Sequence, residues 1–466
     1  MALIRRAAGI SLWLIASVAP GEYATAQEQE PTTEERLAAL EREVEELRAQ
    51  VDSSGTVDAA EIQRQLDAIS REIETLKLGQ DVVVTVGERG RFGMGPAASK
   101  VYRVQQGASL GGYGEMLYEN FASQRQDGTP ADQADQLDFL RAVVYLGYKF
   151  NDQILFNSEI EYEHASTAGA GSVSIEFAYL DFFISTGLGV RAGLILLPMG
   201  FINEQHEPNT FLGTTRPESE RRIIPTTWRE NGAGIFGQAG PLEFRAFVVN
   251  GLDAVAGGSS GATGFTARGL RGGRQRGSKA VAEDMAVVAR LDYVNVRGLM
   301  AGTSVYIGNS GQGTAPPANP TAPIGALTTI WEARVQYRAH GFDLRALGTL
   351  AWVDDVRALN FAQGFTGDES IGERMYGGYV QVGYDVLRRA RTRNRLLPYL
   401  RLERIDTQAR VPAGFQSNPT NDEAIVTVGA QWLPIQQVVV KADYQFRSDK
   451  ADQGVNQFNI ALGYVF

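Results

Sequence analysis

From about residue 110 to its end, this sequence alternates between apolar and polar residues with a period of two. Residues 438–446, VVVKADYQF, show the pattern clearly. One set of positions holds Val438, Val440, Ala442, Tyr444 and Phe446. The other set holds Val439, Lys441, Asp443 and Gln445. Successive side chains of a β-strand point to opposite faces, so the pattern predicts strands with one apolar and one charged face. The charged face excludes a sandwich core, and the apolar face has to be buried against something else.

Sixteen segments of this kind follow one another, and most have ten or more residues, which is enough for a tilted strand to span a bilayer. We expect strands at 110–119, 136–150, 152–164, 172–184, 187–198, 231–239, 241–250, 284–295, 297–308, 327–339, 341–353, 373–388, 394–406, 422–433, 435–447 and 455–466. Short turns are expected near Asn151, Thr186, Gly240, Asn295, His340 and Pro434. Long loops are expected at 121–135, 199–230, 251–283, 309–326, 354–372 and 407–421. An even strand number with short turns at one end and long loops at the other predicts an all-β, 16-stranded antiparallel transmembrane β-barrel.

The last ten residues, QFNIALGYVF, read as a strand that ends on the aromatic residue Phe466. An open strand at this position would leave unpaired N–H and C=O groups, which hydrocarbon cannot satisfy. We therefore expect the last strand to pair with the first, LGGYGEMLYEN, and Phe466 to lie at the membrane interface.

Two segments precede the barrel. Arg5 and Arg6, an apolar run and an A-x-A motif at 24–26 predict a signal peptide over residues 1–26, because the apolar run is too short for a membrane anchor. Residues 27–80 carry two apolar seams at heptad spacing, which predict a periplasmic α-helical coiled coil; an amphipathic helix lying on the barrel, or a helical hairpin, is the alternative. The seams are Leu37, Leu40, Val44, Leu47 and Val51, and then Ile62, Leu66, Ile69, Ile73 and Leu76. Residues 81–466 remain for the barrel.

Composition argues against an enzyme and against a nucleic-acid partner. The chain has no cysteine, which removes thiolate metal sites and thiol nucleophiles. Its three histidines, His164, His206 and His340, show no metal-ligand or catalytic spacing, so we expect no metal, no cofactor and no enzymatic activity. The net charge of −10 is unfavourable for a general nucleic-acid binder.

Two loops carry the charges from which a pore could be built. The loop 199–230 is predicted to fold into the barrel as a constriction, in which opposed charges set a selectivity filter. Its charged residues are Arg216, Arg221, Arg222 and Arg229, facing Glu204, Glu207, Glu218 and Glu220. The alternative is an extracellular cap held by its own ion pairs. A second loop, with Arg268, Arg271, Arg274, Arg276 and Lys279, attracts anions or lipopolysaccharide phosphates in one interpretation and is a mobile solvated loop in the other.

Strand parity directs a further set of charged side chains into the lumen. The main candidates are Arg141, Arg191, Arg334, Arg338, Arg345, Arg401, Lys441, Glu159 and Glu161. The two signs are nearly balanced among the inward positions, so many of these residues are expected to pair across neighbouring strands.

Several motifs resemble the phosphate-selective porin O and P family: GGYGE at 111–115, VRAGLILLPMGF at 190–201, and KADYQFR at 441–447. The resemblance covers most of the chain and implies trimers of water-filled channels, some of which select anions. It also implies that Phe466 is read by the outer-membrane barrel-assembly machinery. The dense Arg and Lys clusters of the selective members do not stand out here, so phosphate specificity rests on the resemblance alone.

We therefore expect an outer-membrane porin for passive diffusion of small hydrophilic solutes, with a modest anion preference. It would contact outer-membrane lipid and lipopolysaccharide. The alternative is a structural outer-membrane anchor whose coiled coil tethers the envelope.

Overall fold

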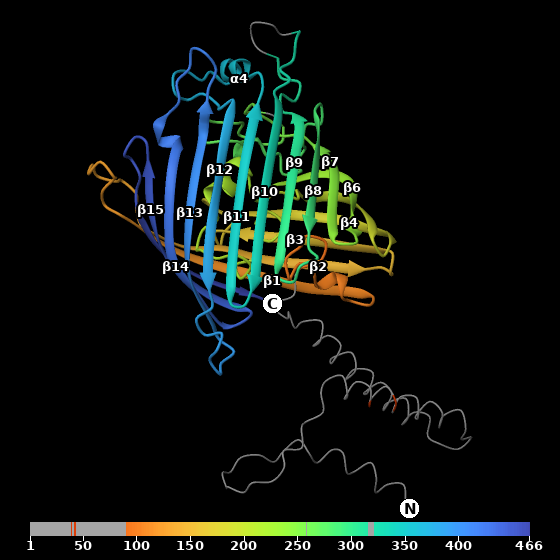
Figure 1. Ribbon diagram of the computed structural model, residues 1–466. Coiled ribbons are helices and arrows are strands. Elements are labelled where there is room, and N and C mark those ends of the chain that lie inside the picture. Colours follow the sequence, from red (N-terminus) through yellow and green to blue (C-terminus); the bar gives the residue numbers. More distant parts are fainter. Residues whose placement is uncertain (1–38, 40–41, 43–89, 258, 316–320) are drawn as a thin grey trace, which may run out of the picture. The chain divides into compact units, whose positions relative to one another are not determined.

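The computed structural model describes residues 39, 42, 90–257, 259–315 and 321–466. The described residues form sixteen antiparallel strands that close into a barrel (Figure 1), as predicted. The strands are β1 (Gly107–Phe121), β2 (Gln136–Lys149), β3 (Ile154–Glu163), β4 (Ser172–Ser185), β5 (Leu188–Leu196), β6 (Arg229–Ala239), β7 (Leu242–Asn250), β8 (Met285–Tyr293), β9 (Leu299–Asn309), β10 (Leu327–Ala339), β11 (Phe342–Val353), β12 (Arg374–Tyr384), β13 (Arg395–Arg410), β14 (Asp422–Ile435), β15 (Val438–Asp449) and β16 (Gln457–Val465).

One short helical segment precedes β1, and the others lie between strands: η1 (Lys100–Tyr102), then η2 (Ser219–Ile223), η3 (Arg271–Gly273), α4 (Val356–Gln363) and η4 (Pro419–Asn421). Among the described residues, no helix combines the length and the apolar character needed to cross a membrane. The predicted signal peptide and coiled coil lie outside the described residues, except for Ala39 and Arg42, which are helical.

The barrel closes where β16 pairs with β1, with Tyr113 opposite Val465. The pairing continues one residue beyond β16: the N–H of Phe466 donates to the carbonyl of Gly112 at 2.9 Å, and the N–H of Gly112 donates to the carbonyl of Phe466 at 3.0 Å. Each other strand pairs with its neighbours in sequence. The expected pairing of the last strand with the first is therefore confirmed.

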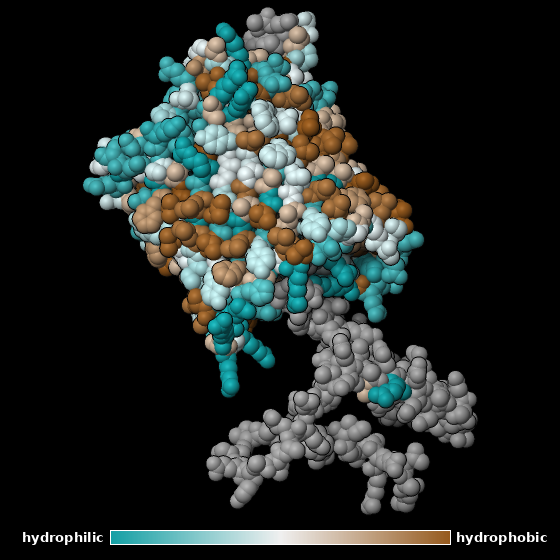
Figure 2. All heavy atoms as spheres, in the orientation of Figure 1, coloured by the Kyte–Doolittle hydropathy of each residue, from teal (hydrophilic) through white to brown (hydrophobic). Residues whose placement is uncertain are grey.

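The outer wall of the barrel is apolar over much of its surface. In β16 the outward residues Phe458 and Leu462 are 37% and 40% exposed, whereas the inward residues Asn459 and Ala461 are buried. Figure 2 shows hydrophobic residues across the wall and hydrophilic residues gathered over the loops and turns. A strand pattern with this polarity, apolar outside and polar inside, is the one that suits a lipid surround.

Short and long connections alternate along the chain, as predicted, but some of them begin or end at other residues than predicted. Pro434 lies within β14, so the turn predicted there falls at 436–437 instead. β13 continues to Arg410, which pairs with Arg374 of β12, so the loop predicted to start at 407 begins later. The loop predicted at 354–372 contains α4, and Gly364, which follows the helix, has a left-handed conformation (φ 72°). Glycine adopts that conformation at helix ends without steric cost.

The interior holds more apolar side chains than the alternating pattern predicts. At the long-loop end of the barrel, wall residues such as Phe247 and Tyr306 pack with loop residues such as Ile224 and Trp228 in one buried cluster. A second cluster joins the segment 90–106 to inward residues of the first five strands and β16. These inward positions are apolar because they face chain that is folded inside the barrel, which periodicity within a strand does not reveal.

We predict that Gly112→Ala weakens the closing seam. A Cβ at Gly112 would lie 2.3 Å from the carbonyl oxygen of Val143 and 2.7 Å from the Phe466 ring. We expect a cost of about 1–3 kcal/mol from this overpacking, measured as a lower midpoint of thermal unfolding in detergent. The control is Gly348→Ala, where an added Cβ meets nothing within 4 Å. Equal midpoints for the two variants would contradict the prediction.

Candidate channel interior

The connection between β5 and β6, residues 197–228, folds inside the barrel and is buried along most of its length. We call it the in-folded loop. Its residues make hydrogen bonds or ion pairs with strands on most sides of the barrel. The wall residues that it contacts are Glu159 (β3), Glu176 (β4), Arg245 (β7), Arg290 (β8), Arg345 (β11), Tyr379 (β12), Glu403 (β13), Glu423 (β14), and Lys441 and Asp443 (β15). The loop therefore crosses the interior from β5 to the opposite wall.

Lys441 and Asp443 hold the far end of the in-folded loop through its backbone. The Lys441 ammonium donates to the carbonyls of Phe211 at 3.0 Å and Gly213 at 2.9 Å. The Asp443 carboxylate accepts from the N–H of Thr214 at 2.8 Å. Parity placed both side chains inside, but their function of capping loop backbone groups depends on a segment more than 200 residues away.

Glu204 and Glu207, two of the predicted acidic residues of the loop, have different partners. Glu204 accepts from Arg245 at 2.8 Å and from Arg290 at 3.1 Å. Glu207 accepts from the N–H groups of Ala97 and Ala98 in the segment 90–106. Burial raises the pKa of Glu207 to about 7 despite these two hydrogen bonds.

Glu220 closes a turn of the in-folded loop on itself. Its carboxylate accepts from the N–H groups of Phe201 at 2.8 Å and Ile202 at 2.9 Å, and from the Tyr379 hydroxyl at 2.6 Å. Glu220 is fully buried. One side chain thus satisfies three buried donors, two from one segment of the in-folded loop and one from β12.

The predicted arginines pair mainly with the wall. Arg221 lies 2.7 Å from Glu218, but Arg222 pairs with Glu423 of β14, and Arg229 pairs with Glu176 of β4 at 2.9 Å. Burial alone would raise the pKa of Glu218, but the nearby guanidinium groups of Arg221, Arg447 and Arg222 outweigh it and lower the pKa to about 2. Among the eight charged loop residues of the prediction, all of which are described, the structure brings together one pair, Arg221 and Glu218.

The arginine-rich connection between β7 and β8 packs onto the in-folded loop. Arg222 donates to the carbonyl of Arg268 at 2.9 Å, and Arg274 donates to the carbonyl of Thr227. Arg276 and Lys279 are exposed. Burial, followed by repulsion from Arg216 and Arg221, lowers the pKa of Arg271 to about 9. Positive charges from two loops therefore gather in one region.

Two of these arginines keep unused hydrogen-bond donors. Nη2 of Arg216 and Nη1 of Arg271 are buried atoms without a hydrogen-bond partner in the part of the chain that the structure describes. Guanidinium donors arranged in this way can bind an oxyanion, because a planar fork of N–H groups matches two oxygens of a phosphate or carboxylate.

The structure places the predicted lumen residues on the inner wall. Those that are buried are Arg141, Arg191, Arg334, Arg345, Arg401, Lys441, Glu159 and Glu161. Arg338 remains exposed, but its guanidinium donates to Asp343 at 2.8 Å and to the carbonyl of Thr210 at 2.7 Å. Neighbouring strands supply many of the partners: Arg191 of β5 meets Asp181 of β4 at 2.7 Å. The expected pairing across strands is present at these positions.

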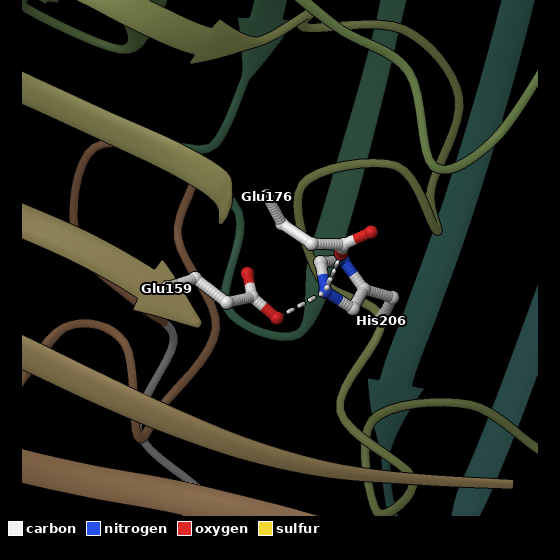
Figure 3. Close-up of side chains that lie close together, drawn as sticks. All are labelled: Glu159, Glu176 and His206. Carbon is white, nitrogen blue, oxygen red and sulfur yellow. Dashed lines mark hydrogen bonds and ion pairs between the residues drawn. The ribbon is translucent and has the colours of Figure 1, made fainter. Parts of the chain in front are cut away.

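Sequence parity missed Glu176, which faces inward on β4 together with its neighbour Phe177. The β3–β4 pairing shifts register between Glu159 and Ile160, opposite these two residues. At such a bulge two successive side chains share a face, so counting alternate positions fails there. Glu176 contacts His206 of the in-folded loop, which also contacts Glu159 (Figure 3).

We predict that Glu220→Ala loosens the in-folded loop. Removing the carboxylate leaves three buried donors without their acceptor, at a cost of about 1–3 kcal/mol. We expect a lower unfolding midpoint and faster protease cleavage within residues 199–230. The control is Glu369→Ala, which removes a carboxylate that accepts from Thr366 on an exposed loop. Unchanged cleavage in Glu220→Ala would show that this carboxylate does not hold the loop.

Comparison with known proteins gives one close relative in sequence. No family model matches the chain. An uncharacterized protein of Aquifex aeolicus (strain VF5) is 36% identical over 399 residues, which cover 84% of this chain and 87% of that protein.

Among solved structures, the chain is similar to OmpF of Salmonella typhi in complex with daunomycin (12% identity, TM-score 0.49, 78% of this chain and 98% of that one). It is also similar to the outer membrane channel DcaP of Acinetobacter baumannii (13% identity, TM-score 0.48, 77% of this chain and 97% of that one). An anion-selective porin from Comamonas acidovorans is similar as well (13% identity, TM-score 0.46, 77% of this chain and 99% of that one).

Proposed function

The chain belongs to the same family as the uncharacterized Aquifex aeolicus protein, and we propose that it is an outer-membrane porin for passive diffusion of small hydrophilic solutes. One observation carries the proposal: the described strands form a closed sixteen-stranded barrel with an apolar outer face and a charged inner face. An apolar exterior suits lipid, and barrels of this strand number enclose enough space for water. Diffusion requires no cofactor and no catalytic step, and we assign none.

The proposed passage lies next to β1 and β15, where charged side chains inside the barrel keep contact with solvent. The side chain of Arg221 is 44% exposed, and that of Arg447 on β15 is 20% exposed. The charges of both act on Glu119 of β1. Closely spaced charges of both signs in a narrow aqueous passage select solutes by their field rather than by a tight site.

The proposed selectivity is a modest preference for anions. Its support is the cluster of Arg216, Arg221 and Arg271, two of which keep unused guanidinium donors. Glu218 neutralises Arg221 in part, and Glu119 opposes the field of the cluster. We therefore expect the channel to pass phosphate together with other small anions. We do not propose the strong phosphate selectivity of the phosphate-selective porins.

We predict discrete conductance steps when the purified protein is added to a planar bilayer, with a reversal potential that indicates anion preference in a potassium chloride gradient. Arg216→Ala should lower the anion-to-cation permeability ratio roughly twofold, because it removes a cation from the passage. The control is Arg389→Ala, which removes an equal charge from the exposed connection between β12 and β13. A wild type that prefers cations would contradict the proposed anion preference. Equal changes of the permeability ratio in both variants would contradict it as well, and neither result would contradict the proposal that the protein is a channel.

A structural anchor is the second candidate, because apolar clusters and the in-folded loop fill much of the described interior. Such an anchor would hold the barrel in the outer membrane while the segment 27–80 tethers the envelope. The same bilayer experiment separates the two: inserted, folded protein without discrete conductance steps would favour the anchor.

We further propose that the protein is exported by the segment 1–26 and inserted by the barrel-assembly machinery through Phe466. In this proposal it lies among lipopolysaccharide molecules as a homotrimer, with residues 27–80 in the periplasm. Deleting residues 33–78 should weaken the trimer and leave the barrel folded, as judged by native mass spectrometry in mild detergent beside thermal unfolding. A monomeric intact protein, or a deletion variant that is still fully trimeric, would contradict this assembly.

A further inference from the structure

We propose that His206, Glu159 and Glu176 bind one divalent transition-metal ion, of the class of Zn²⁺, inside the barrel. The three residues come from the in-folded loop, β3 and β4, and Figure 3 shows both carboxylates directed at the imidazole. His206 Nε2 lies 3.1 Å from Glu159 Oε1 and 3.3 Å from Glu176 Oε2. Ligand atoms about 2.0–2.2 Å from one Zn²⁺ lie roughly 3–3.5 Å from each other, so these separations fit a shared ion.

The other nitrogen of His206 sets the ring in the orientation that metal binding needs. Nδ1 lies 3.1 Å from the carbonyl oxygen of Asn203. A carbonyl can only accept, so Nδ1 carries a proton. In the neutral ring the lone pair is then on Nε2 and points between the two carboxylates. A histidine that donates one N–H to a backbone carbonyl and binds a metal with the other nitrogen is a common arrangement at metal centres.

The carboxylates have oxygens that the described chain leaves unused. Oε2 of Glu159 is buried and has no hydrogen-bond partner among the described residues. Oε2 of Glu176 is also buried without a hydrogen bond, although it lies 3.3 Å from His206 Nε2. Oε1 of Glu176 accepts from Thr227 and from Arg229, both at 2.9 Å, which orients the carboxylate with Oε2 toward His206. An ionised buried oxygen without a partner is costly, and a bound cation would remove that cost.

The charges around the site also favour a cation. Four buried carboxylates are connected there, since Glu161 contacts Glu176 and Arg141 links Glu161 to Glu115. Two guanidinium groups, those of Arg141 and Arg229, accompany them. The carboxyl groups of this cluster therefore outnumber its guanidinium groups. A bound divalent cation beside His206 would offset this excess of acidic groups.

The ligand set indicates the class of ion. One imidazole and two carboxylates, with no cysteine in the chain, suit Zn²⁺ or another first-row divalent ion better than a soft monovalent ion. The ion would fasten the in-folded loop to β3 and β4, so its function is structural. The ligands lie on three separate segments, which is why no local spacing in the sequence indicates the site.

The test uses the full-length protein in detergent, stripped with a chelator and then titrated with Zn²⁺ at pH 7.5. We expect one tightly bound Zn²⁺ per chain by calorimetry and by elemental analysis after dialysis. Glu159→Gln and His206→Gln should each weaken binding at least tenfold. The control is His164→Gln, because His164 contacts Asp138 at 2.6 Å in a half-exposed pair outside this site.

Circular dichroism and thermal unfolding check that each variant is folded, and Glu159→Gln keeps the side-chain shape if His206→Gln does not fold. Co²⁺ supplies a second readout, since its visible absorption should appear in the wild type and disappear in Glu159→Gln. If the folded wild type binds no Zn²⁺, or if Glu159→Gln and His164→Gln bind it equally, the proposal is overturned. The cluster is then an ion pair of protonated His206 with its two carboxylates.

Discussion

The structure depends on the pairing of β16 with β1. A sheet in hydrocarbon cannot leave a row of N–H and C=O groups unpaired, so sixteen strands with apolar outer faces have to form a ring. The two hydrogen bonds between Gly112 and Phe466 complete that ring at its end. Once the ring is closed, each strand has a fixed inner face, and the positions of Arg191, Lys441 and Asp443 inside the barrel follow from it.

The interior is stabilised by contacts between loops and wall rather than by the wall alone. Buried charges are tolerated because most have a partner across a strand or on the in-folded loop, as with Glu204 between Arg245 and Arg290. Removing one charged side chain from such a group leaves its partners as buried charges without an opposite charge nearby. The in-folded loop is therefore part of the packing of the barrel as well as an element of the proposed passage.

The barrel could be predicted from the sequence because its pattern is local: strand existence, strand number and inward parity all follow from a period of two. The interior could be predicted only in part. Glu176 was missed because a bulge breaks the parity, and the burial of the segment 90–106 was missed because it lacks any period. Lys441 contacts Phe211, and Ser219 contacts Glu403. These contacts join segments that are far apart in the sequence, so no spacing of residues predicts them.

The in-folded loop touches β14 and β15 on one side of the seam and β3 and β4 on the other. The loop is made after β5 and before β6, so it is present long before its partners on β14 and β15 are synthesised. The contacts of the loop with β14 and β15 therefore form late in assembly, after those two strands have been made.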